Sequence, residues 1–192
     1  QYKSPFIELN HYKILIIHYY LKNDYENISM ALKNIEQLIQ QYPFINSESH
    51  ILYYNLELAK YYRHIGDIQK AKNNLKNCIK ISDYQAFNKF EVQAWYFDLM
   101  VKNKHYRKAV KIVHEVLNTY QFQLLDEYDV SGWYIREAYI YFILSAIDDQ
   151  KSIKEYLPKY NGKTIVGKLL ERTQPSSKDK KGYNVLLLII KT

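Results

Sequence analysis

The segment from Ile51 to Asp83 carries the pattern of two helices joined by a tight turn, and it constrains the fold more than any other stretch of this chain. Apolar residues recur at helical spacing on both sides of Gly66-Asp67. Glycine accepts the positive φ that ends a helix, and an aspartate in this place caps the helix that follows. The segment therefore predicts one complete helical hairpin over about residues 48–82.

The same periodicity predicts two further hairpins, over about residues 7–43 and 89–120. Pro43 ends the first of them, because the residue before a proline disfavours the α conformation. The three hairpins recur at a period of about 40 residues, which is typical of stacked helix pairs. Each pair needs neighbours to bury its apolar faces.

The remainder of the chain is predicted to be helical but to depart from this repeat. An acidic break over residues 126–131 separates it from the hairpins, and additional helices are expected within residues 132–192. The C-terminal ones are expected over about 164–172 and near 183–191, on either side of a polar loop. The predicted fold class is therefore all-α, as a single domain over residues 1–192.

Six positions of the best hairpin resemble a tetratricopeptide repeat. They are Ala59, Tyr62, Gly66, Ala71, Leu75 and Cys78. The resemblance covers roughly residues 8–120, and it implies antiparallel hairpins stacked in a right-handed superhelix, an α-solenoid with irregular C-terminal helices. The neighbouring copies depart from the pattern, since Lys104 replaces the turn glycine and Phe97 stands where a small residue is expected.

The resemblance also implies a binding surface, because the first helix of each pair lines the concave side of such arrays. By spacing from Gly66 and Ala71, it places seven candidate residues there. They are Tyr53, Lys60, Arg63 and His64 in the best hairpin, and Glu91, Asp98 and Lys102 in the next. This mixed lining suits an extended peptide. The alternative is that these residues form the solvated sides of amphipathic helices.

Two features of composition leave alternatives open. The 21 tyrosines either fill the seams between helices or line an aromatic groove. The whole net charge of +7 comes from residues 151–192. This basic end either contacts nucleic acid, anionic lipid or an acidic protein, or is simply solvated.

The single cysteine and the hydropathy bear on location. Cys78 cannot form an internal disulfide, and its apolar helical position predicts a buried side chain. The longest apolar run, Val185 to Ile190, is far shorter than the roughly 20 residues of a membrane-spanning helix. We expect a cytoplasmic protein. Because the chain opens with Gln1 instead of Met, we also expect it to be part of a longer protein.

The sequence holds only incomplete catalytic motifs. Gly162-Lys163-Thr164 ends like a phosphate-binding loop, but Leu157 stands where its first glycine belongs. His114-Glu115 begins like a zinc-protease helix, but Asn118 replaces the second histidine. We therefore expect no catalytic residue, no cofactor and no metal, and not an enzyme.

The leading hypothesis is a scaffold module that binds a protein or peptide on its concave face. The alternative is the peptide-sensing domain of a bacterial-type transcription regulator, whose DNA-binding domain would lie outside this chain. Nucleic-acid binding through this chain alone is not expected. The sequence leaves the oligomeric state open.

Overall fold

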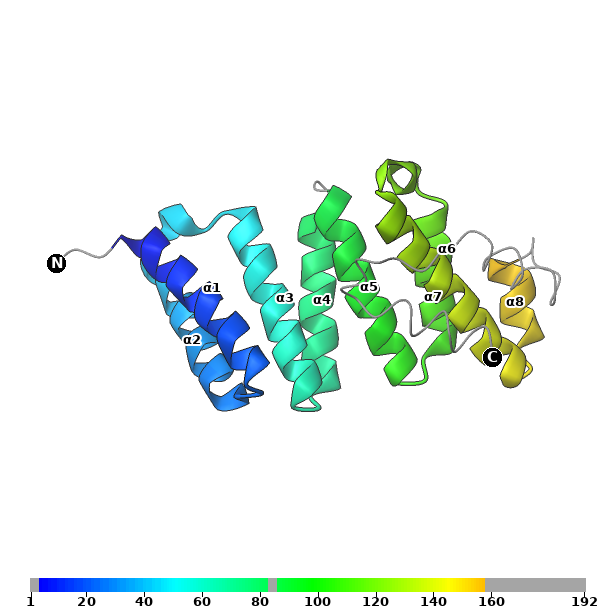
Figure 1. Cartoon of the computed structure of the whole chain (residues 1–192), viewed down its shortest axis with the longest axis horizontal. Helices are drawn as coiled ribbons and strands as arrows, with labels where there is room; N and C mark the ends of the chain where they lie inside the picture. Colours follow the sequence, from blue (N-terminus) through cyan, green and yellow to red (C-terminus); the bar gives the residue numbers. More distant parts are fainter. Residues whose placement is uncertain (1–3, 83–85, 158–192) are drawn as a thin grey trace. The chain divides into compact units, whose positions relative to one another are not determined.

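A computed structural model describes residues 4–82 and 86–157, and the regular structure in these ranges is entirely helical (Figure 1). The all-α prediction is confirmed for this part of the chain. The α-helices are α1 (Pro5–Leu21), α2 (Tyr25–Gln41), α3 (Glu48–His64), α4 (Ile68–Ser82), α5 (Ala86–Lys102), α6 (Tyr106–Leu117), α7 (Glu127–Ala146) and α8 (Gln150–Tyr156). Two short 3-10 helices follow α2 and α6, η1 (Pro43–Ile45) and η2 (Tyr120–Leu124).

Four turns of three residues join these helices in pairs, and each has a middle residue at positive φ. These residues are Asn23, Gly66, Lys104 and Asp148, with φ values of 55°, 84°, 59° and 55°. In the last of these turns, the main-chain N–H of Asp149 donates to the carbonyl of Leu144 at 2.9 Å. This is the hydrogen bond that closes a helix through a left-handed residue. Within residues 4–82 and 86–157 this turn geometry therefore occurs four times, once more than the number of hairpins that the sequence pattern predicts.

Aspartate caps the second helix in three of these pairs. The carboxylates of Asp24, Asp67 and Asp149 each accept a hydrogen bond from the main-chain N–H three residues later, at 3.1–3.2 Å. These bonds satisfy an N–H group that the helix leaves without a partner. The cap predicted at Asp67 is thus present, and it is one of a set.

The start of α7 differs from the prediction. The helix begins at Glu127, although the sequence pattern placed residues 126–131 in a break and started the helix at 132. The side chain of Asp126 accepts a hydrogen bond from the main-chain N–H of Asp129 at 2.8 Å. Acidic residues in a first turn also face the positive end of the helix dipole. The acidic cluster therefore forms the N-terminus of α7 and does not interrupt the helix.

The chain divides into two compact units, residues 1–92 and 93–192. In the first unit, α2 packs against α1 and α3, and α3 packs against α4. Its core consists of apolar residues from the first half of the unit: Leu9, Ile16, Ile28, Ala31, Leu32, Ile35, Leu38 and Ile45. Cys78 is buried, as predicted, and so are the small residues Ala59 and Ala71. The Cys78 thiol donates to the carbonyl of Leu52 at 3.7 Å.

In the second unit, the helices α6, α7 and α8 pack against one another. Branched apolar side chains fill the space between them, and the buried ones include Val110, Val113, Val116, Ile135, Ile140, Leu144 and Ile153. Among the described residues, no helix is both long enough and apolar enough to cross a membrane. The predicted helices over 164–172 and 183–191, and most of the basic stretch 151–192, lie outside the described residues.

Two large apolar residues of the first unit, Met30 and Ile65, lie on the surface. Met30 is about half exposed because it lies two residues from both Ile28 and Leu32, and residues at that spacing do not share a helix face. Ile65 is equally exposed because it is the C-cap residue of α3, where the chain turns away from the hairpin.

Candidate functional site

Side chains of α1 and α3 meet along one side of the first unit. The Lys13 ammonium lies 4.8 Å from the centre of the Tyr53 ring. About two turns further along α1, the Tyr20 hydroxyl donates to the main-chain carbonyl of Glu57 at 3.5 Å. Partial burial lowers the pKa of Lys13 and raises that of Tyr20, which the neighbouring Glu57 carboxylate raises further. We refer to this surface, which continues to His64, as the α1–α3 face.

Three of the predicted binding residues on α3 belong to this face. Tyr53 is half-buried, and its hydroxyl is enclosed with no hydrogen-bond partner in the structure. Burial raises the pKa of this hydroxyl. The exposed His64 has its Nδ1 3.1 Å from the Tyr25 hydroxyl, and the two rings are 4.9 Å apart. The histidine is therefore held in place by its contact with α2.

Lys60 has a structural role on the same face. Its Nζ lies 2.7 Å from Oε1 of Glu57, whose side chain is only 8% exposed. A buried carboxylate without a counter-charge is strongly destabilising. The primary role of Lys60 is therefore to neutralise the charge of Glu57 within the fold. The fourth residue, Arg63, is half-buried in the last turn of α3.

The second predicted set lies on α5. Glu91 is exposed and belongs to the first unit, whereas Asp98 and Lys102 belong to the second. Oδ1 of Asp98 is 3.7 Å from Nε of the largely buried Arg136 on α7. Lys102 is exposed in the last turn of α5. The boundary between the two units therefore divides the second predicted set.

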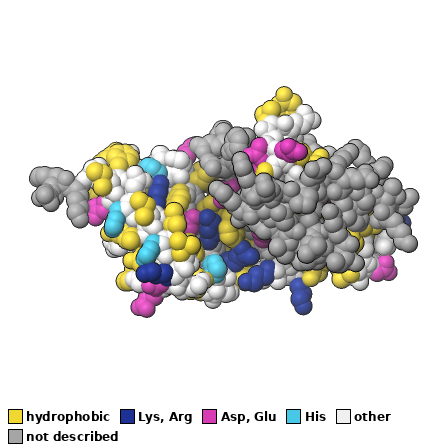
Figure 2. All heavy atoms as spheres, viewed as in Figure 1, with side chains coloured by type: hydrophobic (Ala, Val, Ile, Leu, Met, Phe, Trp, Pro, Cys, Tyr) yellow, Lys and Arg dark blue, Asp and Glu magenta, His cyan; other side chains and the backbone are white. Residues whose placement is uncertain are grey.

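The most exposed apolar surface of the first unit was not predicted as part of the site. Ile7, Ile14, Ile17 and Leu21 of α1 are 69%, 65%, 60% and 81% exposed. On the opposite side of the helix, Leu9 and Ile16 are almost completely buried. We call the four exposed residues the α1 seam. Figure 2 shows hydrophobic side chains over α1 and α3, interspersed with histidine and basic side chains.

The seam includes positions equivalent to those chosen on α3. Counted back from the turn residues Asn23 and Gly66, Ile17 and Leu21 occupy the places that Lys60 and His64 occupy on α3. The signal was present in the sequence, since the apolar run 14–17 continues around the helix and cannot all face one side. Spacing from Gly66 and Ala71 places candidate residues on α3 and α5 but none on α1.

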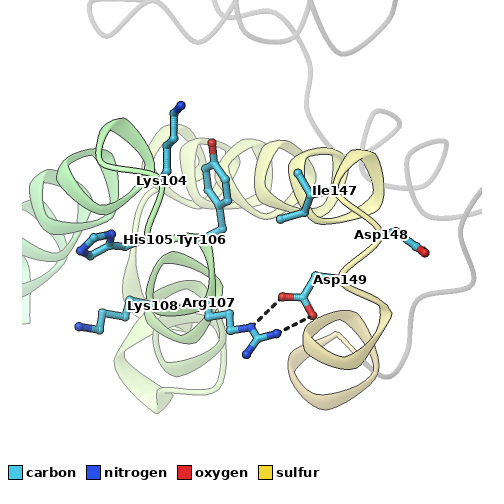
Figure 3. Close-up of a pocket in the computed structure, with 8 residues that line it drawn as sticks. All are labelled: Lys104, His105, Tyr106, Arg107, Lys108, Ile147, Asp148 and Asp149. Carbon is cyan, nitrogen blue, oxygen red and sulfur yellow. Dashed lines mark hydrogen bonds and ion pairs between the residues drawn. The ribbon is translucent and has the colours of Figure 1, made fainter.

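A cleft lies in the second unit. This open cleft of about 670 Å³ is lined by residues of two hairpin turns, namely Lys104, His105, Tyr106, Arg107, Lys108, Ile147, Asp148 and Asp149 (Figure 3). Nε of Arg107 donates to Asp149 at 2.9 Å and holds the pKa of that carboxyl at about 2. The ion pair links the first turn of α6 to the N-cap residue of α8. The carboxylate of Asp149 is thus paired with Arg107 and also caps α8. Because both interactions stabilise the fold, we assign this cleft a structural role.

Within residues 4–82 and 86–157, no group of three or more His, Cys, Asp or Glu side chains could hold a metal ion. Burial raises the pKa of the only cysteine, Cys78, to about 12, so its thiol is poorly suited to act as a nucleophile. Comparison of the chain with protein-family models, with curated proteins and with solved structures found no match.

Proposed function

We propose that this chain is a binding module that holds a protein or peptide against the α1 seam and the adjoining α1–α3 face. The observation that carries the proposal is the seam itself, a line of aliphatic side chains, interrupted by Asn10, that is exposed on a helix whose opposite side is already in the core. A helix that is apolar on all sides is normally covered on all sides. Contiguous exposed apolar surface of this kind is typical of interaction sites.

The energetics favour a partner that covers the whole seam. Full burial of one isoleucine or leucine side chain contributes about 1.5–3 kcal/mol. Association costs on the order of 4–15 kcal/mol in lost freedom of motion, so one or two such contacts would not be enough. The four seam residues together offer a gain of the required size. The neighbouring Lys13 and His64 add polar contacts that fix the orientation of a partner.

The recurrence of one turn geometry at four places supports a helical repeat of the tetratricopeptide type. In the α-solenoid that the sequence resembles, the first helix of each pair lines the binding surface, and α1 and α3 are such first helices. In this proposal the array binds its partner in the cytoplasm, where a chain with one buried cysteine needs no disulfide.

Affinity purification from the native cell with quantitative mass spectrometry tests the proposal. The seam variant Ile17→Asp with Leu21→Asp should lose its specific partners, because a carboxylate cannot be buried in an apolar contact without a counter-charge. Met30→Asp is the matched control, since Met30 is about half exposed on α2, away from the seam. The same partners recovered with the seam variant and with the wild type would overturn the proposal.

Charge reversal at Lys60 is a poor test of binding. Lys60→Glu would place a second carboxylate beside the buried Glu57, and the resulting loss of stability would resemble loss of binding. His64→Glu is the better probe of the α1–α3 face, because His64 is exposed. We expect weaker partner recovery with His64→Glu, by less than with the seam variant.

A further inference from the structure

We propose that the partner of the α1 seam is an amphipathic helix whose apolar stripe is flanked by acidic residues. This inference rests on the proposed function and names the class of partner. It follows from the spacing of the seam residues, from the side chains on either side of the seam, and from the poor fit of two other occupants.

The spacing is that of a helix–helix seam. Ile7, Ile14 and Leu21 recur every seven residues, and Ile17 lies three residues after Ile14. Asn10 occupies the corresponding place one heptad earlier. Apolar residues at alternating intervals of three and four form the line along which two helices pack. The seam extends about 21 Å along α1, enough for a partner helix of four turns.

The N-terminal end of the seam adds an aromatic contact. The ring of Phe6, which is about half exposed, lies 5.9 Å from the ring of Phe44, and Phe44 is also exposed. Phe6 precedes Ile7 at the N-terminal end of α1, so we expect a large apolar residue at that end of a partner helix to pack against these rings. The seam therefore has a distinct end, which would set the register of the partner.

The flanks of the seam carry hydrogen-bond donors and positive charge. His11 and His18 follow the seam positions Asn10 and Ile17 on one side, and Lys22 lies beyond them at the helix end. Lys13 lies on the other side, next to Tyr53. Residues in these flanking positions of paired helices set partner choice through charge. Glutamates in the partner's flanks would accept hydrogen bonds from both sides of the seam.

Acidic residues are scarce on α1 itself. Glu8 is the one acidic residue of this helix, and at about 100° per residue it lies about 130° from the midline of the seam, whereas His11 and His18 lie only about 70° from it. The next acidic side chain, Asp24, caps α2. On α1 a basic partner helix would therefore meet mostly like charge in the flanks of the seam.

Two other occupants fit less well. A second copy of this chain, paired through α1, would bring histidine and lysine flanks against the same flanks, which is unfavourable. A bilayer surface favours a broad apolar face with a strongly charged opposite face. Here the opposite face of α1 is in the core and the exposed line is narrow. A single helix is the occupant that matches both the width and the charge.

Fluorescence anisotropy with labelled synthetic peptides tests the proposal on the full chain. The probe is a peptide of about three heptads with leucine in the seam positions and glutamate in the flanks, which repels itself and so remains available. A peptide with lysine in the flanks is its control. We expect the acidic peptide to bind at least about tenfold more tightly than the basic one.

Variants locate the binding site and its charge preference. Ile14→Asp with Ile17→Asp should weaken binding of the acidic peptide by at least about tenfold, whereas Met30→Asp should leave it unchanged. His18→Glu with Lys22→Glu, both at exposed positions, should shift the preference towards the basic peptide. Circular dichroism of each variant checks that the helices remain folded.

Three results would overturn the inference. The first is equal binding of the acidic and basic peptides. The second is seam-dependent association with vesicles of phosphatidylcholine and phosphatidylserine in the absence of peptide binding. The third is a seam-dependent dimer in sedimentation equilibrium. If the peptides fail but the seam variant still loses its cellular partners, the partner class is wrong and the proposed function stands. If the seam variant loses no partner, both fail.

Discussion

Single residues in the turns fix the geometry of the hairpins. Gly66 and Lys104 hold φ values of 84° and 59°, a region that costs an L-residue roughly 1–2 kcal/mol and a glycine almost nothing. A Cβ added at Gly66 would meet no atom within 4 Å, so the backbone alone sets the cost of Gly66→Ala. We expect Gly66→Ala to lower the free energy of unfolding by about 1 kcal/mol, and Lys104→Gly to raise it by a similar amount. Urea unfolding followed by circular dichroism measures both changes. Equal stability of wild type and both variants would contradict the left-handed turns.

The carboxyl group of Asp149 makes one turn sensitive to acid. The hydrogen bond from Arg107 holds its pKa at about 2, below the ordinary value of 3.8. A carboxyl with a depressed pKa stabilises the fold above its unfolded pKa, and this contribution is lost as the pH falls through the folded value. We expect the melting temperature of the wild type to fall as the pH drops from 3.8 towards 2. Asp149→Asn, which still caps the helix but does not titrate, should lose less. Parallel acid dependence of the two proteins would contradict this role.

At this scale the sequence predicts residues whose type has one main use. Gly66 and Asp67 were identified as a turn and a cap, and Cys78 as buried, because glycine, aspartate and a lone apolar cysteine each favour one environment. Lys104 and Asp148 were not recognised as left-handed residues, since nothing in a lysine or an aspartate requires that conformation. The surrounding helices impose it.

Whole helices show their roles through the contrast between their faces. On α1, Ile16 is completely buried, whereas Ile14 is 65% exposed. We expect Ile16→Ala to lower the free energy of unfolding by about 2–5 kcal/mol, because it removes core volume. Ile14→Ala should change it by no more than about 0.5 kcal/mol. Urea unfolding of both variants tests the orientation of α1. A large loss for Ile14→Ala would mean that the seam is already covered within the chain, and the proposed binding surface would have to be abandoned.

The helix α6 begins less favourably than α2, α4 and α8. Its N-cap residue His105 makes no side-chain capping bond, and Arg107 lies in the first turn near the positive end of the helix dipole. We expect His105→Asp to stabilise the protein by about 1 kcal/mol, which is a rise of a few degrees in melting temperature. His105→Asn separates the two contributions, because it restores the cap without the charge. An unchanged or lower melting temperature for both variants would show that a cap cannot form there.

Helix positions were predictable where both ends carry local signals, and the hairpin of α3 and α4 has the bounds that the sequence predicts, 48–82. The start of α7 was misplaced because its acidic first turn has the same composition as a solvated loop. The α1 seam was missed for a different reason. Periodicity locates the face that is buried, but an apolar helix has no polar face to mark its exposed side, and only the packing of α2 and α3 identifies it.

Over the whole molecule, local signals predict the class of fold but not its division. The hairpin pattern predicts helices throughout, and all regular secondary structure in the described residues is helical. The boundary between the two compact units falls within α5, a continuous helix whose sequence does not mark it. Such a boundary depends on which distant residues contact each other, and no single segment encodes that. The predicted binding residues Glu91 and Asp98 were assigned as one set because they are spaced like their counterparts on α3.

Because the chain divides into two compact units, we expect two unfolding events. Tryptophan fluorescence and circular dichroism distinguish them. Both tryptophans, Trp95 and Trp133, belong to the second unit, so their fluorescence reports that unit, whereas circular dichroism reports helices of both. Ile35 is fully buried in the first unit, and Ile35→Ala should cost about 2–5 kcal/mol. We expect this variant to lose ellipticity at lower urea concentration while the fluorescence midpoint stays near that of the wild type.

Ile140→Ala supplies the matched control, because Ile140 is equally buried but belongs to the second unit. This variant should lower the urea midpoint measured by fluorescence. At low urea concentration it should not lose the ellipticity that the helices of the first unit contribute. If Ile35→Ala instead lowered both midpoints together, the continuous helix α5 would be transmitting stability across the boundary, as neighbouring repeats do in a cooperative array. The size of the common shift would then measure the coupling between the two units.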